Sequence, residues 1–146
     1  MEARSATQDL DERQAQRLAK EGKVDVALRE YEELQSSDPL MIISSQAWND
    51  LCWFGSIYGK AEEVFFAGDI ALAFRTDDGN FHDTRGVALA MSGKTKEAIQ
   101  DFEAYLWWTR LHERRTERQQ WIRDLKSGKP VDEIFTAKVI ERLSTQ

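Results

Sequence analysis

Apolar residues recur at helical spacing along most of the chain, and short turns with glycine or proline separate the runs. Residues 24–35 show this most regularly, with apolar side chains at i, i+3, i+4 and i+7. The pattern predicts an all-α chain. We predict helices over residues 7–21, 24–35, 61–74 and 81–92, one from Ser44 or Ser45 to the turn at Gly59, and one from Lys96 onward, with Asn80 and Thr95 as N-caps.

The helix over residues 61–74 is apolar on most of its circumference. Such a helix is typical of the centre of a fold, so we expect it to be buried. Gly68 interrupts it, and we expect a neighbouring side chain to fill the space beside this glycine.

The C-terminal part of the chain has a different pattern. No glycine or proline occurs between Leu106 and Gly128, but the apolar stripe lapses over residues 113–120, so we predict a break or bend near Thr109. The stripe returns at Trp121, and residues 131–143 are predicted to form one final amphipathic helix. We expect residues 109–146 to cap the apolar end of the preceding helices within the same domain.

Residues 80–108 resemble an earlier stretch of the chain at a fixed spacing of 34 residues. The copies align His82 with Trp48, Gly86 with Cys52, Gly93 with Gly59, Ala98 with Val64, Phe102 with Gly68, and Tyr105 with Ala71. A still earlier copy has Gly22, Ala27, Tyr31, Leu34 and Pro39, and about three extra residues near 40–44 separate it from the second. Self-similarity at such a period indicates a stacked helical array.

The small and large residues of these copies follow the order found in tetratricopeptide repeats, which residues 8–108 resemble. The resemblance implies a right-handed stack of about three helix pairs, over 8–40, 44–76 and 80–108, followed by capping helices over 109–146. A narrower set of strings, LCWFGSIYGKAEEV, DTRGVALAMSGKTKEAIQDFEAYLWW and QQWIRDL, is similar to repeat-containing segments of large bacterial signalling and defence proteins. That likeness implies a bacterial adaptor.

In tetratricopeptide repeats, the first helix of each pair lines a concave groove that binds a partner. By register, the resemblance places in this groove Lys20, Asn49, Trp53, Ile57, Asp83, Val87 and Met91, with Gln16, Ser56 and Ala90 beside them. Trp53 is the preferred anchor, because tryptophan is enriched among interface hot spots. The alternative is that Trp53 packs as core under the C-terminal helices. Of the Lys/Asn set that clamps a C-terminal carboxylate in some family members, only Lys20 and Asn49 have counterparts.

Trp107 and Trp108 are adjacent in a predicted helix, so their rings point about 100° apart and cannot both face one core. We expect one ring to cover the neighbouring helix and the other to be exposed or covered by a partner. Trp108 joins the groove residues as a candidate partner-binding residue.

Charge is distributed unevenly along the chain, whose net charge is −6. Residues 1–108 carry 11 Lys and Arg against 20 Asp and Glu, a net of −9, whereas residues 109–146 carry 9 against 6, a net of +3. The acidic body gives no general attraction to nucleic acid or an anionic membrane. We interpret the arginine-rich helix over residues 110–123 as a solvated face laced with salt bridges. The single cysteine and the lack of a long apolar run favour a soluble, cytoplasmic protein.

The chain offers little catalytic chemistry. His82 occupies the helix-packing position of Trp48 one repeat earlier, and His112 lies among charged residues. Cys52 is expected to be a buried structural thiol, and the string SGKT at 92–95 lacks the strand and glycine-rich loop of a phosphate site. We therefore expect no catalytic residue, no cofactor and no metal site.

The leading hypothesis is a non-enzymatic adaptor that binds a peptide or helix of a protein partner through the groove or a tryptophan-bearing face. One alternative is a structural subunit that self-associates into a homo-oligomer. Another is an accessory RNA-associated protein that uses the arginine-rich helix.

Overall fold

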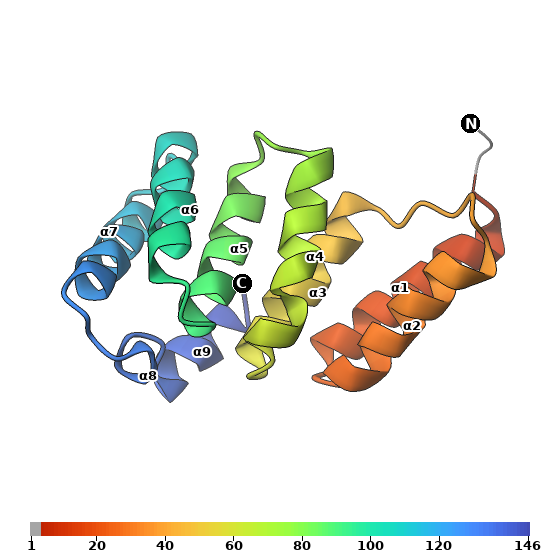
Figure 1. Ribbon diagram of the computed structural model, residues 1–146, viewed down its shortest axis with the longest axis horizontal. Coiled ribbons are helices and arrows are strands. Elements are labelled where there is room, and N and C mark those ends of the chain that lie inside the picture. The colour runs from red at the N-terminus through yellow and green to blue at the C-terminus, as the bar shows by residue number, and fades with distance from the viewer. Residues whose placement is uncertain (1–3) are drawn as a thin grey trace.

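A computed structural model describes residues 4–146 and shows an all-α fold (Figure 1). Within these residues the helices are α1 (Ala6–Lys20), α2 (Val24–Ser37), α3 (Ser45–Ile57), α4 (Ala61–Phe74), α5 (Gly79–Met91), α6 (Thr95–Trp108), α7 (His112–Lys126), α8 (Val131–Ile134) and α9 (Ala137–Leu143). The first six helices form three consecutive antiparallel pairs, and α7 packs on α6. The fold is therefore compatible with a helical repeat.

The turns inside the three pairs share one geometry. Gly22, Gly59 and Gly93 each follow a helix with a φ between 79° and 86°, a left-handed conformation that glycine adopts without strain. The next residue, a lysine in every case, donates its amide to a carbonyl five residues earlier at 2.8 to 2.9 Å. The three pairs thus end their first helix in the same way.

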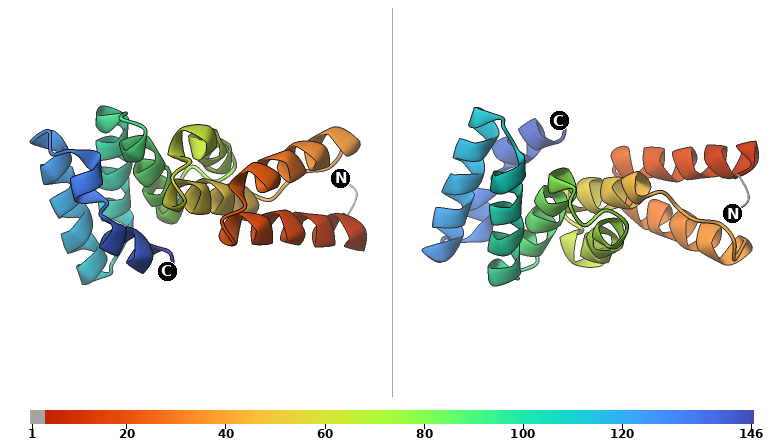
Figure 2. Two further views of the ribbon diagram at one scale, coloured as in Figure 1. Left: turned by 90° about the horizontal axis from the view of Figure 1, so that it is seen from below. Right: turned by 90° about the horizontal axis from the view of Figure 1, so that it is seen from above.

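The pairs pack unequally along the stack. Helix α1 packs on α3, α3 packs on α5, and α4 also packs on α5. Helix α2 contacts α3 much less, because the extended linker over residues 38–44 separates them (Figure 1). In Figure 2 the first pair extends from one end of the stack. The linker contains the additional residues, about three, that separate the first two copies.

Two clusters of buried residues form the core. The first lies between the first two pairs and contains Tyr31, Trp48, Leu51 and Val64. The Tyr31 hydroxyl donates to the carbonyl of Ala47 at 2.7 Å, which links α2 to α3. The second cluster joins α5 and α6 to the C-terminal helices and contains Val87, Phe102, Trp121, Ile122, Leu125, Ile134, Phe135 and Leu143.

Close packing within the second pair depends on Gly55 of α3. A Cβ at this position would lie 2.5 Å and 2.7 Å from the two γ-methyl carbons of Val64 on α4. We therefore expect Gly55→Ala to lower the free energy of unfolding by about 1–3 kcal/mol, because the helices must separate or Val64 must move. Thermal unfolding measures the change. Gln119→Ala, at an exposed helical position, is the matched control and should change stability by less than about 0.5 kcal/mol.

Most predicted helices match the structure, and the predicted break after Trp108 is confirmed, because residues 109–111 are not helical. Two predicted caps are wrong. The side chain of Asp78, not Asn80, accepts the first amides of α5, and the Thr95 side chain caps no helix. The Asp78 carboxylate precedes the helix and reaches two free amides, which Asn80, already inside the helix, cannot do.

The predicted single helix over residues 131–143 is also wrong. It is divided into α8 and α9 at Phe135, whose ring turns into the second cluster and packs 4.8 Å from the centroid of the Trp121 ring. Thr136 then starts a new helix, since its hydroxyl accepts the amide of Val139 at 3.3 Å. Burial of one aromatic side chain outweighs helix continuity here.

Helix α4 is less buried than its composition predicted. Val64, Ala67 and Ala71 are fully buried, but Phe66 and Phe74 are 41% and 58% exposed. The helix lies on one side of α3 and α5, so only one of its faces meets the stack. The space beside Gly68 is filled by the aliphatic part of Arg85, whose Cβ and Cγ would each lie 3.0 Å from an added Cβ, and by the sulfur of Cys52.

Candidate partner-binding surfaces

The inner face of the stack was predicted to be an open groove, and the C-terminal segment covers part of it. Ile57, Val87 and Met91 belong to the second cluster, in which Phe135 and Leu143 contact the same core. Val87 is fully buried and Ile57 is 7% exposed. The expectation of an open groove is therefore corrected for Val87. Helices α8 and α9 turn back from α7 over this face (Figure 2), and Ile57 and Met91 line a remaining opening of about 550 Å³ together with Phe135 and Ile140.

Asp83, also predicted to face a partner, is held inside the chain by Arg118 of α7. The Arg118 Nε and Nη2 atoms donate to the two carboxylate oxygens of Asp83 at 2.9 Å and 2.7 Å. The guanidinium is fully buried and lies over the Trp121 ring at 4.4 Å and the Tyr105 ring at 5.4 Å. Burial disfavours the cation, but the hydrogen bonds and charge of Asp83 outweigh it and raise the pKa of Arg118.

The interpretation of the arginine-rich helix as wholly solvated is wrong for Arg118 for the same reason. The side chain points inward, because it lies on the apolar face of α7 with Trp121, Ile122 and Leu125. Other members of the series, such as Arg110 and Arg123, are exposed.

A smaller opening remains on the inner face, and we call it the inner pocket. It has a volume of about 240 Å³ and is bounded by α3, by α5 with its preceding turn, and by Arg114 of α7. Asn49 and Trp53 lie in its wall, so the structure brings these two predicted residues together. Lys20 is exposed on α1, and its carbonyl accepts the Tyr58 hydroxyl at 3.0 Å.

The two adjacent tryptophans have different surroundings, as their spacing predicted. Trp108 packs on the backbone of Gly79, where an added Cβ would lie 2.3 Å from the indole ring, and its ring centroid is 6.1 Å from that of Tyr105. It remains 48% exposed, whereas Trp107 is 92% exposed. The more accessible ring is therefore that of Trp107, whereas Trp108 was the predicted partner-binding residue.

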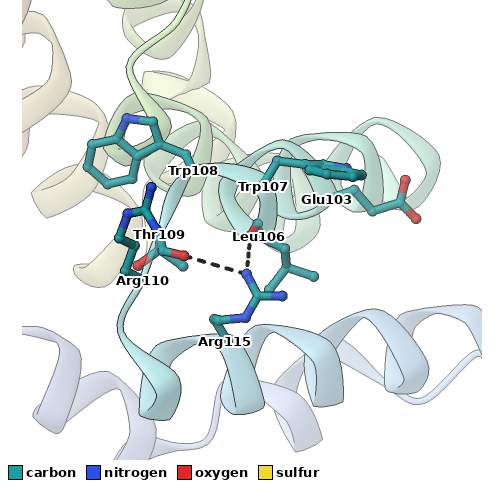
Figure 3. A pocket seen from close by; sticks show the side chains of 7 residues that line it. All are labelled: Glu103, Leu106, Trp107, Trp108, Thr109, Arg110 and Arg115. Carbon is teal, nitrogen blue, oxygen red and sulfur yellow. Dashed lines mark hydrogen bonds between the residues drawn. The ribbon is translucent and has the colours of Figure 1, made fainter.

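Another opening, which we call the corner pocket, lies where α6 ends and α7 begins (Figure 3). Its volume is about 550 Å³, and its lining residues are Glu103, Leu106, Trp107, Trp108, Thr109, Arg110 and Arg115. Figure 3 shows the two indole rings on either side of the end of α6, with both arginines below them.

The two arginines of the corner pocket have different tasks. Arg115 donates from Nη1 to the carbonyls of Leu106 and Thr109, so it caps the free end of α6. Arg110 forms no ion pair or side-chain hydrogen bond with any residue of the 4–146 range. Figure 3 shows the unpaired Arg110 side chain below the Trp108 ring, with the Trp107 ring on the other side of the end of α6. The signal available in sequence was the short string WWTR, which combines a helix end with both residue types.

The two histidines considered for catalysis differ in position: His82 forms hydrogen bonds between helices, and His112 is exposed. His82 Nδ1 lies 2.9 Å from a carboxylate oxygen of Asp101, and Nε2 lies 3.0 Å from the carbonyl of Thr76, so the ring ties the start of α5 to α6 and to the preceding turn. His112 is exposed at the start of α7. The described part of the chain contains no group of three His, Cys, Asp or Glu side chains placed to hold a metal ion.

Cys52 is fully buried, and burial raises the pKa of its thiol to about 12. The thiolate is the reactive form, so we expect the folded protein to react with a thiol reagent such as DTNB at pH 8 far more slowly than the protein unfolded in urea. The absorbance of the released thiolate measures both rates. Equal rates in the folded and unfolded protein would contradict the buried position.

No helix within residues 4–146 is long and apolar enough to cross a membrane. Comparison of the chain with family models, with curated proteins and with solved structures gives no match.

Proposed function

We propose that this chain is a non-enzymatic protein–protein interaction module of the tetratricopeptide type, which docks a peptide or helix of a partner protein at the corner pocket. The fold supports the repeat assignment through its three antiparallel helix pairs, whose turns have one geometry at Gly22, Gly59 and Gly93. The inner groove is the usual docking surface of such repeats, but here part of it holds α8 and α9. The corner pocket is the opening that two accessible tryptophan side chains line.

The observation that carries this proposal is the 92% exposure of Trp107 beside the corner pocket. An indole left in water forgoes the burial that usually stabilises a large apolar side chain, and such exposed apolar groups mark interaction sites. Arg110 adds a fixed positive charge at the rim, and tryptophan and arginine are the residues most enriched among interface hot spots. A partner segment with an apolar side chain next to a carboxylate fits this pair.

The test is co-purification of partners from the native host with the wild-type chain and with Trp107→Ala, each with and without nuclease. We expect a stoichiometric protein partner that survives nuclease and whose affinity falls by about 2 kcal/mol, or about 30-fold, in the variant. The purified pair gives this number by calorimetry. Trp107 packs little against the chain, so the thermal unfolding temperature of Trp107→Ala should equal that of the wild type.

Leu40→Ala is the matched control, since Leu40 is 77% exposed but lies in the linker between the first two pairs. It should retain the partner at full affinity. A partner held equally well by Trp107→Ala would remove the corner pocket as the docking surface, and a partner lost on nuclease treatment would favour the RNA-associated alternative.

A further inference from the structure

We propose that the opening between the end of α3 and α8 is a second docking site, which takes a partner peptide with a large apolar residue between lysines or arginines. We call this opening the α3–α8 groove. It has a volume of about 550 Å³ and is bounded by the turn from α3 to α4, by the end of α5, and by α8 and α9. None of its lining residues lines the corner pocket, so the two sites are separate.

The floor of the groove is apolar and only partly covered by the chain. Ser56 is the buried polar side chain at this floor, and its hydroxyl already donates to the carbonyl of Cys52 at 2.7 Å. An apolar anchor that enters the groove therefore covers apolar surface without stranding this hydroxyl. The apolar side chains at the floor are the buried Ile57 and Phe135 and the half-buried Met91, Val131 and Ile140.

The rim of the groove carries two carboxylates whose charge no cation of the chain balances. Glu62 lies in the first turn of α4 and Asp132 in the first turn of α8, so they belong to different walls. Both side chains are exposed, and neither forms an ion pair or a side-chain hydrogen bond with another residue of the described chain. Both are therefore available to a partner.

Lys60 is the cation that lines the groove, and carboxylates of the chain already surround it. Its Nζ atom lies 3.8 Å from Glu63 Oε1 and 4.0 Å from Asp25 Oδ1. The lining residues have three carboxylates against this one ammonium, a net charge of −2. The field of the groove is thus negative, with the same sign as the net charge of −6 of the whole chain.

Charge complementarity identifies the occupant. An apolar side chain fits the floor, and basic residues on its two sides can pair with Glu62 and Asp132. A volume of about 550 Å³ is typical of a ligand pocket and accommodates one large anchor with its neighbouring backbone. The corner pocket presents the positive charge of Arg110 instead, so the two sites select peptides of opposite charge.

The experiment titrates the full chain with three peptides and follows the methionine methyl signals by NMR. The first peptide has a Leu-Phe centre with two lysines on each side. The second has the same centre between glutamates, and the third has two serines between the same lysines. We expect the first to bind with a dissociation constant of about 0.1 mM and the others at least about tenfold more weakly. The Met91 methyl signal should shift, whereas that of Met41, buried in the first cluster, should not.

Charge reversal at the rim gives the test its sign. The double variant Glu62→Lys, Asp132→Lys should weaken the binding of the first peptide about tenfold and strengthen that of the glutamate peptide. The double variant Glu32→Lys, Glu33→Lys is the matched control, because it changes the net charge equally on an exposed part of α2. It should change either affinity less than about twofold, since distant exposed charges are screened by salt.

Three results would overturn the inference. The serine peptide could bind as tightly as the first peptide, or the α2 control could weaken binding as much as the rim variant; either would show a general attraction to an acidic chain. A Met91 signal that stays in place at saturation would exclude the groove. Trp107→Ala should leave the affinity for the first peptide unchanged, so this proposal and the corner pocket fail separately.

Discussion

Arg118→Ala should lower the free energy of unfolding by about 3–5 kcal/mol, the largest effect that we expect from a single charged residue in this chain. The substitution leaves the carboxylate of Asp83, which is 5% exposed, without its counter-charge. It also removes the guanidinium that packs on Trp121 and Tyr105. Urea unfolding followed by circular dichroism measures the change.

The reason lies in the asymmetry of buried ion pairs. Forming the pair gains little net free energy, because both charges lose their hydration, whereas removing one partner strands the other. The double variant Asp83→Leu, Arg118→Met should therefore recover most of the stability lost in Arg118→Ala. Arg123→Ala, at an exposed position on the same helix, is the matched control and should stay within about 0.5 kcal/mol of wild type. If Arg118→Ala behaved like Arg123→Ala, the ion pair would contribute nothing to the fold.

Phe135→Ala should lower the free energy of unfolding by about 3–5 kcal/mol, as expected for removal of a buried aromatic side chain. Phe135 is 6% exposed, and its ring packs against Trp121 between α8 and α9. Loss of the ring should also loosen the segment that covers Ile57 and Met91. Faster amide exchange in residues 131–143 than in α5 would accompany the lower stability.

Lys138→Ala is the control for this prediction, since Lys138 is exposed on α9. Its stability and its amide exchange should match those of the wild type. A Phe135→Ala protein with normal stability would show that α8 and α9 are held by their other contacts, among them Leu143, which is fully buried.

The sequence predicted much of the architecture because its strongest signals are local. Glycines at 22, 59 and 93 mark helix ends through backbone conformation alone, and the structure has the left-handed turn at each of them. The break at Thr109 was predicted from a lapse in the apolar stripe. Such signals depend on residues close together in the chain, so no tertiary information is needed to interpret them.

The errors fall where a distant residue decides the outcome. Arg118 was grouped with its charged neighbours, although it lies three, four and seven residues before Trp121, Ile122 and Leu125 and so shares their face. That spacing was the available signal. Only the position of Asp83, 35 residues earlier, explains how a cation is accommodated there.

The choice between Trp107 and Trp108 had the same difficulty. The sequence predicts that the two rings point in different directions. Gly79 determines which of them packs, because its missing side chain makes space for Trp108. Phe135 likewise interrupts a regular amphipathic pattern in order to reach Trp121. The sequence does not show which of the two rings stays exposed. For this reason it did not identify Trp107 and Arg110 as candidate binding residues.

The junction between the first helix pair and the rest of the stack has a consequence for how the molecule responds to force and to solvent. The first buried cluster spans this junction, and the hydrogen bonds across it include two that water can reach, from Gln16 to Asp50 and from Tyr58 to the backbone of Lys20. In a linear array, each junction contributes its own share of the cooperativity. We therefore expect the N-terminal pair to separate or unfold first, while the four helices that follow stay together as one unit.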